Sequence, residues 1–205
     1  MFEPAAHWED VYGRKKPDEV SWFAPHLKRS LAFVEKAGLP HEAAIIDVGG
    51  GASTLVDDLL ERGHSNVTVL DISANAIEVA KQRLGARALE VQWRVGDITE
   101  VALPEGAFDF WHDRAVFHFL RQTADREKYV ANVRRALKPG GHILVATFGP
   151  EGPQRCSGLD VMRYSSDQLH GEFGDDFRKV ESLTELHATP SGGEQQFVYC
   201  YCRIQ

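Results

Sequence analysis

The chain has 205 residues, of which 43% are hydrophobic and 26% charged, so we expect one globular domain, residues 1–205, around one core. Its formal net charge of −7 disfavours a nucleic-acid-binding surface, and no apolar run approaches the roughly 18 residues that cross a bilayer. The start, Met1-Phe2-Glu3-Pro4, lacks the basic and apolar stretches of a signal peptide, and the three cysteines have no metal-ligand or disulfide spacing. We therefore expect a cytoplasmic protein that binds no nucleic acid, membrane or metal.

Two helices are expected ahead of the first core strand. The pattern predicts a short helix over His7–Tyr12 and a longer one over Leu27–Ala37, which ends at Gly38. Between them, residues 13–23 are polar at first and then aromatic, with Trp22 near the end.

A glycine-rich turn follows the first strand. The apolar run Ala43–Val48 predicts a buried parallel strand, and the glycines Gly49–Gly51 then let the backbone turn tightly and pass close to a ligand. Ser53 is expected to cap the next helix, whose apolar positions begin at Leu55. Strand, glycine turn and helix N-terminus together indicate a nucleotide-type site.

The spacing of the glycines bears on the kind of nucleotide. A dinucleotide fingerprint, G-x-G-x-x-G, would place its third glycine at Thr54. Instead an acid, Asp47, precedes Gly49 at the end of the strand, where it suits a positively charged ligand such as S-adenosylmethionine (SAM). The pattern Asp47-x-Gly49-x-Gly51 resembles the first motif of class I SAM-dependent methyltransferases, with Ser53 in place of that family's last glycine. The resemblance implies that Asp47, Gly49 and Gly51 bind SAM.

The N-terminal region carries a looser resemblance. The run Trp8…Tyr12…Val20-Ser21-Trp22 resembles the N-terminus of small bacterial methyltransferases and of eukaryotic relatives that methylate lysines in translation elongation factors. The family often folds this region over the cofactor, which implies a lid over residues 1–38 with Trp22 above the sulfonium, where cation–π attraction would act. The alternative is that Trp8 and Trp22 anchor the helices on the core, and we favour that role for Trp8.

An acid also closes each of the next two predicted strands. Asp71 follows strand Asn66–Leu70 at the offset from Gly51 where nucleotide-binding folds place an acid on the ribose hydroxyls. Its alternative role is at the N-terminus of the helix that begins at Ser73. Beside it, Ile72 would pack on the adenine.

The third predicted strand, Leu89–Val95, ends in Gly96-Asp97-Ile98. An isolated Gly-Asp pair is usually a turn. In the resembling family an acid here accepts a hydrogen bond from the adenine amino group beside an apolar neighbour. The resemblance thus implies that Asp97 and Ile98 bind the cofactor.

The fourth strand and its exit, Phe108–Arg114, correspond to the family's fourth motif, whose exit faces the transferring methyl. This implies that Asp113 contacts the cofactor and that Asp113 and Arg114 are catalytic candidates. The alternative is a surface ion pair. We interpret His118, between Phe117 and Phe119, as a core histidine.

The C-terminal half predicts the end of the sheet. The turn Lys138-Pro139-Gly140-Gly141 before an apolar strand is frequent in the resembling family. A closing antiparallel hairpin, with Cys200 and Cys202 buried on one face, distinguishes that family's sheet from the ordinary dinucleotide fold. We expect an α/β, Rossmann-like seven-stranded sheet of order 3-2-1-4-5-7-6 with strand 7 antiparallel and helices on both faces. The remaining expected elements are helix Asp125–Leu137, strand His142–Phe148, helix Ser165–Glu172, and strands Phe177–His187 and Gln195–Arg203.

The expected division is a lid (1–38), a SAM-binding core (39–150), and an acceptor-side loop with the closing hairpin (151–205). Ligands bind outside the carboxyl ends of the strands in an open α/β sheet, so the loop 149–164 and the turn 188–193 are expected to form the acceptor wall. His187 is the third catalytic candidate. The other polar groups expected on this wall are Arg155, Cys156, Arg163 and Tyr164.

The predicted function is methyl transfer from SAM to a small-molecule or protein nucleophile by a monomer or weak homodimer. A compact chain favours a small acceptor, whereas the N-terminal resemblance keeps a protein lysine open. A SAM-binding module without catalysis and an NAD-type oxidoreductase are the alternatives, the second disfavoured by the glycine spacing.

Overall fold

The structure, a computed structural model, describes residues 3–205. Met1 and Phe2, the first residues of the N-terminal stretch analysed above for a signal peptide, lie outside the described residues. The helices are α1 (Pro4–Arg14), α2 (Lys28–Ala37), α3 (Leu55–Glu61), α4 (Ala74–Leu84), α5 (Thr123–Ala136) and α6 (Ser166–Phe173). Short 3-10 turns are η1 (Pro17–Glu19), η2 (Gly85–Glu90) and η3 (Phe117–Phe119). The strands are β1 (Ile45–Val48), β2 (Val67–Asp71), β3 (Val91–Val95), β4 (Phe108–Arg114), β5 (Leu137–Phe148), β6 (Arg155–Cys156), β7 (Leu159–Asp160), β8 (Phe177–Ala188) and β9 (Glu194–Ile204).

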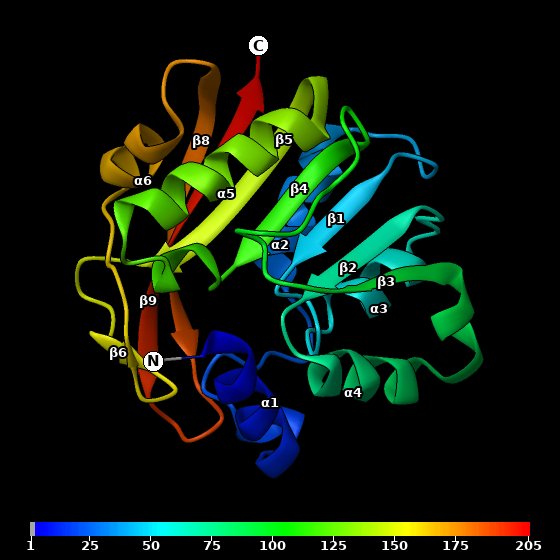
Figure 1. Cartoon of the computed structure of the whole chain (residues 1–205), viewed down its shortest axis with the longest axis vertical. Coiled ribbons are helices and arrows are strands. Elements are labelled where there is room, and N and C mark those ends of the chain that lie inside the picture. The colour runs from blue at the N-terminus through cyan, green and yellow to red at the C-terminus, as the bar shows by residue number, and fades with distance from the viewer. Residues whose placement is uncertain (1–2) are drawn as a thin grey trace.

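A seven-stranded sheet of order β3-β2-β1-β4-β5-β9-β8 forms the centre of the molecule (Figure 1). Strands β1 to β5 pair in parallel, and β9 runs antiparallel to both β5 and β8. The predicted order and the reversed last strand are therefore confirmed. The parallel strands place their carboxyl ends at one edge of the sheet, where α1 also lies (Figure 1).

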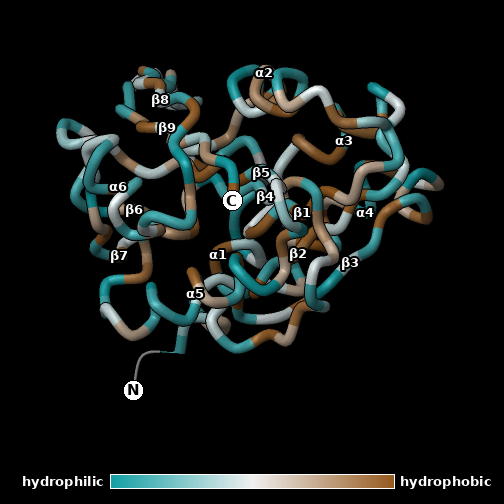
Figure 2. Tube along the Cα trace, turned by 90° about the horizontal axis from the view of Figure 1, so that it is seen from above, coloured by the Kyte–Doolittle hydropathy of each residue, from teal (hydrophilic) through white to brown (hydrophobic). Residues whose placement is uncertain are grey.

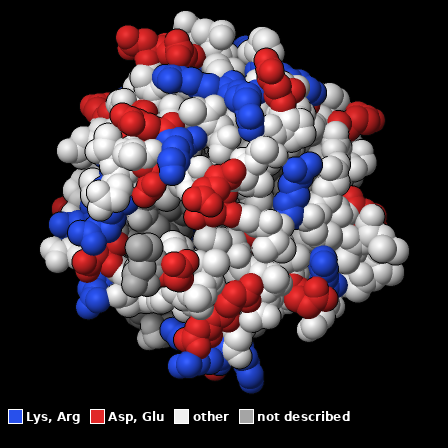
Figure 3. All heavy atoms as spheres, viewed as in Figure 1, with Lys and Arg blue, Asp and Glu red and all other residues white. Residues whose placement is uncertain are grey.

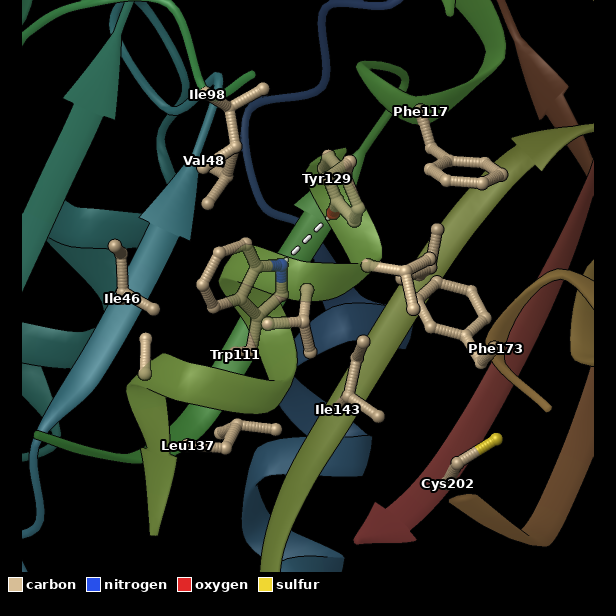
Figure 4. Packing of buried hydrophobic residues seen from close by; sticks show 14 of the residues in the cluster. Ile46, Val48, Ile98, Trp111, Phe117, Tyr129, Leu137, Ile143, Phe173 and Cys202 are labelled. Carbon is tan, nitrogen blue, oxygen red and sulfur yellow. Dashed lines mark hydrogen bonds between the residues drawn. The ribbon is translucent and has the colours of Figure 1, made fainter. Parts of the chain in front are cut away.

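The two faces of the sheet are buried under different helices. Alternate side chains of β1 divide between them, so that Ile45 packs with α2 and α3 while Ile46 packs with α5 and α6. On the α5 face the indole Nε1 of Trp111 donates to the hydroxyl of Tyr129 at 2.9 Å, as Figure 4 shows. Because both faces are covered, the central strands carry apolar residues on both faces, and Figure 2 shows brown, hydrophobic segments near the labels of β1 and β2.

Several predicted boundaries are wrong by a few residues, each for a local reason. Thr54 rather than Ser53 stands at the N-cap of α3, but its hydroxyl donates to the carbonyl of Ala24, while Oγ of Ser53 accepts from the N–H of Leu55 at 3.2 Å. The third strand begins at Val91 rather than Leu89, because η2 extends the chain after α4. The loop 149–164 is not wholly irregular, since β6 and β7 pair within it as a short antiparallel ribbon.

Helix α1 is fastened to the start of α4. The carboxylate of Glu9 accepts from the backbone N–H groups of Ala74 (2.6 Å) and Asn75 (3.2 Å). These N–H groups belong to the first turn of α4, where backbone N–H groups have no acceptor within the helix. A negatively charged side chain is therefore stabilised at this position. Helix α2 ends, as predicted, at Gly38 in the left-handed conformation (φ 64°).

On the face drawn in Figure 3, the described acidic and basic side chains are interspersed, without a large patch of one sign. No helix within residues 3–205 is long and apolar enough to cross a membrane.

Candidate active site

A cavity of about 720 Å³ opens at the carboxyl ends of β1 to β4, beneath α1. Its walls come from the glycine turn, from the ends of β2, β3 and β4, from α1 and the segment after it, and from the ribbon β6–β7. The site thus lies where an open α/β sheet binds its ligands.

The glycine turn adjoins the cavity, which Gly49 lines, and a Cβ at any of its three glycines would clash. Gly49 has φ 70°, and a Cβ there would lie 2.0 Å from Cγ2 of Val116. A Cβ on Gly50 would lie 2.3 Å from Oδ2 of Asp47, and one on Gly51 would lie 2.5 Å from Cβ of Ala76. This crowding agrees with the tight turn expected of the three consecutive glycines.

Asp71 links the glycine turn to the end of β2. Its Oδ2 accepts from the N–H of Gly51 at 2.9 Å and its Oδ1 from the N–H of Ser73 at 2.8 Å. Burial raises the pKa of this carboxyl to about 6, and the two backbone hydrogen bonds oppose the rise only in part. Asp71 therefore lines the cavity as an oriented acid, and Ser73 caps α4 as predicted.

The far end of the cavity combines apolar and acidic groups. Ile72 and Ile98 both line it, together with Asp97. Oδ1 of Asp97 accepts from both the backbone N–H and the hydroxyl of Thr99 at 2.8 Å, which fixes the carboxyl in a tight turn after β3. These three predicted residues are brought together on one wall.

Asp47 belongs to a buried chain that was not predicted from the sequence. Its Oδ1 lies 2.6 Å from Nδ1 of His112, and Nε2 of His112 lies 2.8 Å from Oγ of Ser30. Asp47 and His112 both line the cavity. No local signal joins these residues, because β1 and β4 meet only through the sheet register.

Asp113 does not reach the cavity, contrary to its prediction as a catalytic and cofactor-binding residue. It is fully buried on the opposite side of β4, because successive side chains of a strand point to opposite faces. Its carboxylate accepts from the N–H groups of Val116 and Phe117 and, at 2.6 Å, from the hydroxyl of Tyr129. Burial raises its pKa to about 6. Asp113 thus holds the chain after β4 in place.

Arg114 does line the cavity, half-buried. Its Nη1 donates to the carbonyl of Trp22 at 3.0 Å and its Nε to the hydroxyl of Tyr199 at 3.1 Å. The guanidinium lies 4.2 Å from the ring centre of Phe197. No carboxylate of the described residues pairs with it within 4.0 Å, and a surface pair with Asp113 is not formed.

Of the polar groups expected on the acceptor wall, Arg155 and Cys156 of the ribbon β6–β7 line the cavity. Arg163 instead donates to the carbonyl of Pro150 at 2.8 Å, because the loop folds back on itself. His187 bonds the carbonyl of Ser21 at 3.0 Å, behind the cavity wall. Tyr164 is buried in the core.

Aromatic rings from the N-terminal region roof the cavity. The ring of Trp8 lies 5.0 Å from that of Phe119 and 5.9 Å from that of Trp22, and all three line the cavity with Tyr12. Trp8 is therefore both an anchor on η3 and a wall of the site. The neighbouring His118 of η3 is a core histidine, as predicted. It is fully buried, and burial lowers its pKa to about 3.

Comparison with known proteins agrees with this geometry. A family model described as a methyltransferase domain matches residues 46–145, which span the glycine turn through β5. A demethylmenaquinone methyltransferase of Thermus thermophilus is 31% identical over 154 residues, 71% of this chain and 68% of that protein. The chain belongs to the class I SAM-dependent methyltransferases. It is thus an enzyme that uses SAM as its methyl donor.

Two further relatives of this methyltransferase differ in their acceptors. The human EEF1A lysine methyltransferase 2 is 24% identical over 192 residues, 86% of this chain and 75% of that protein. A structure of Burkholderia thailandensis 1,6-didemethyltoxoflavin-N1-methyltransferase, with 1,6-didemethyltoxoflavin and S-adenosylhomocysteine, has a TM-score of 0.72 at 21% identity. It covers all of this chain, and the chain covers 92% of it. The family therefore includes enzymes for both proteins and small molecules.

Proposed function

We propose that this methyltransferase acts on a small aromatic acceptor with an ionisable oxygen. The observation that carries the proposal is the roof of the cavity, where Trp8, Trp22 and Phe119 face a space shared with the half-buried cation Arg114. Aromatic rings favour planar apolar molecules, and a guanidinium whose described partners are neutral favours a negative oxygen.

The cofactor would lie along the ends of β1 to β3. Oδ2 of Asp47 would accept from the ammonium of the methionine part, and the backbone of Gly49 and Gly51 would pass close to it. Asp71 would accept from the ribose hydroxyls, since a carboxylate has lone pairs beyond the two backbone bonds it makes here. Ile72, Asp97 and Ile98 would hold the adenine.

The reaction would be an in-line displacement in which the acceptor oxygen forms a bond to the methyl carbon as the bond from carbon to sulfur breaks. The enzyme's part is alignment and exclusion of water, which supply about 7–11 kcal/mol in favourable cases. Arg114 would stabilise the anionic form of the acceptor, so that its proton is lost before transfer. Tyr12 would not serve as a base, because burial raises the pKa of its hydroxyl far above its usual range.

The proposal is tested by measuring S-adenosylhomocysteine formation with a panel of phenols, aromatic amines, thiols and a lysine peptide. We expect turnover with phenols, and a fall of roughly tenfold or more in kcat/KM for the acceptor in Arg114→Met. If Arg114→Met changes only the affinity for the cofactor, Arg114 binds the methionine carboxylate instead.

A protein lysine is the second candidate acceptor, because the human relative that matches 86% of this chain is a lysine methyltransferase. The mouth of the cavity also carries the carboxylates of Glu100, Asp125 and Asp160. Turnover of the lysine peptide, with none of the small acceptors, would favour it.

We also propose that residues 1–38 act as a lid, 39–150 as the SAM-binding core and 151–205 as the acceptor-side part of one domain. Contacts between this N-terminal part and the core support the division; the ring of Trp8, for example, packs against that of Phe119. Three buried free cysteines are compatible with a reducing cytoplasm, and a monomer or weak homodimer is the proposed assembly.

A further inference from the structure

A chain of three buried polar side chains lies behind the floor of the cavity. Ser30 on α2, His112 on β4 and Asp47 on β1 are each at most 1% exposed. The hydroxyl of Ser30 and a carboxylate oxygen of Asp47 lie 2.8 and 2.6 Å from the two ring nitrogens of His112. Because Asp47 and His112 are direct partners in the register of β1 and β4, the sheet itself fixes their separation.

The carboxylate of Asp47 fixes the direction of one of these two hydrogen bonds. A carboxylate accepts only, so Nδ1 of His112 carries the proton and donates to Oδ1 of Asp47. In the neutral ring, Nε2 then accepts from the hydroxyl of Ser30. With both nitrogens engaged, the ring cannot rotate without breaking a buried hydrogen bond.

The second carboxylate oxygen of Asp47 has no hydrogen-bond partner among the described residues, although it is buried. It lies against the glycine turn, where a Cβ on Gly50 would come within 2.3 Å of it. Leaving a buried charged acceptor unpaired is costly, so this oxygen is set to receive a cationic donor from the cavity that Asp47 lines.

We propose that His112 is a positioning residue that selects ligands carrying the α-ammonium group of the methionine part. By engaging Oδ1, it keeps Oδ2 directed at that ammonium, and Ser30 holds the ring in place from α2. This rests on the proposed placement of the cofactor. It assigns to His112 a part in the discrimination between S-adenosylhomocysteine and 5′-methylthioadenosine, which shares the nucleoside and sulfur but lacks the amino-acid group, both ammonium and carboxylate.

Two substitutions separate the two hydrogen bonds of the ring. In His112→Asn the amide nitrogen takes the place of Nδ1, because both are bonded to Cγ, so the donor to Asp47 is kept. In His112→Gln the amide reaches toward Ser30, and the donor to Asp47 is lost. The affinities of each variant for S-adenosylhomocysteine and 5′-methylthioadenosine are measured by calorimetry.

For His112→Gln we expect the affinity for S-adenosylhomocysteine to fall roughly tenfold or more, with that for 5′-methylthioadenosine within about twofold of the wild type. His112→Asn should keep affinity for S-adenosylhomocysteine within about threefold. Asp47→Asn should match or exceed the loss of His112→Gln, again only for the ligand with the ammonium. Ser30→Ala, the mildest change, should give a loss of about two- to fivefold with the same selectivity.

Equal losses for both ligands in His112→Gln would overturn the proposal, as would an Asn variant as weak as the Gln variant. If His112→Gln does not fold, which thermal unfolding would show, the selectivity of Ser30→Ala decides in the same way. A wild-type protein that binds 5′-methylthioadenosine as tightly as S-adenosylhomocysteine would refute the ammonium site at Asp47 and with it the role of His112. If the wild type prefers S-adenosylhomocysteine but the variants lose affinity equally for both ligands, the role of His112 is refuted and the ammonium site at Asp47 is not.

Discussion

The backbone N–H of Gly51 donates to Oδ2 of Asp71 at 2.9 Å, which joins the turn after β1 to the end of β2. The acid is thereby oriented before any ligand arrives, and neither oxygen is free to turn away from the cavity. Because Asp71 is also buried, its charge is poorly solvated until a donor reaches it.

The affinity for S-adenosylhomocysteine should therefore depend on the protonation of Asp71, whose pKa burial raises to about 6. Ribose hydroxyls that donate to the carboxylate favour its charged form, so binding lowers this pKa and releases a proton below pH 6. We expect affinity to rise roughly tenfold between pH 5 and pH 7, measured by calorimetry. Asp71→Asn should bind more weakly and lose most of this slope; an unchanged slope would assign the titration to another group.

Tyr129→Phe should destabilise the protein by about 1–3 kcal/mol, because the buried indole N–H of Trp111 loses its acceptor and the carboxylate of Asp113 loses its hydroxyl donor, while keeping its two backbone donors. The folded-state pKa of Asp113, about 6, lies above its unfolded value, so the carboxyl is protonated in the fold below that pH. The loss should hence be larger at pH 8 than at pH 5, as measured by urea unfolding. In an Asp113→Asn background this difference between the two pH values should disappear.

Trp22→Leu should weaken SAM more than S-adenosylhomocysteine, because only SAM carries the positive sulfonium. A desolvated cation–π contact is worth about 2 kcal/mol, which corresponds to roughly 30-fold in affinity. We expect a fall of that order for SAM and a change of at most about threefold for S-adenosylhomocysteine. Trp93→Leu, on β3 outside the cavity, is the matched control and should leave both affinities unchanged. Equal losses in Trp22→Leu would make Trp22 a plain anchor.

Bound S-adenosylhomocysteine should protect residues 13–23 from trypsin. Arg14 and Lys15 are exposed and offer trypsin sites, whereas the bond after Lys16 resists trypsin because Pro17 follows it; Trp8 and Trp22 on either side of these sites line the cavity. A ligand that fills the cavity therefore stabilises the segment and suppresses the openings that expose it to the protease. Time courses of cleavage with and without ligand measure this, and identical courses would show that the segment does not respond to the cofactor.

The acids that close β2 and β3 could be predicted because each is a local pattern, whereas the sheet order followed from the resemblance to the methyltransferase family. Asp71 ends a run of mostly apolar residues and Asp97 follows the glycine after the next strand, and parallel strands bring their carboxyl ends to one edge. The glycine turn was readable for the same reason, since Gly49 to Gly51 need only the chain on either side of them.

What could not be predicted depends on pairings between distant segments. Which face of β4 meets the cavity decides between Asp113 and Arg114, and alternation alone leaves that choice open. His187 lies near the end of β8, which is the edge strand of the sheet. Although it lies at the same end of the sheet as the carboxyl end of β1, the strands between them keep it away from the cavity. The bond between Asp47 and His112 likewise exists only through the register of β1 with β4.

Glu9 connects the roof of the cavity to the first turn of α4, directly after the residues that would hold the ribose and adenine. The roof and the nucleoside site are thus joined at this contact, and if residues 1–38 act as the proposed lid, spent cofactor would leave when the contact opens. Product release rather than methyl transfer would then limit the steady-state rate, as in many enzymes with lids. Loosening the attachment would shorten the residence time of the product, and an enzyme that binds its cofactor less tightly would turn over faster.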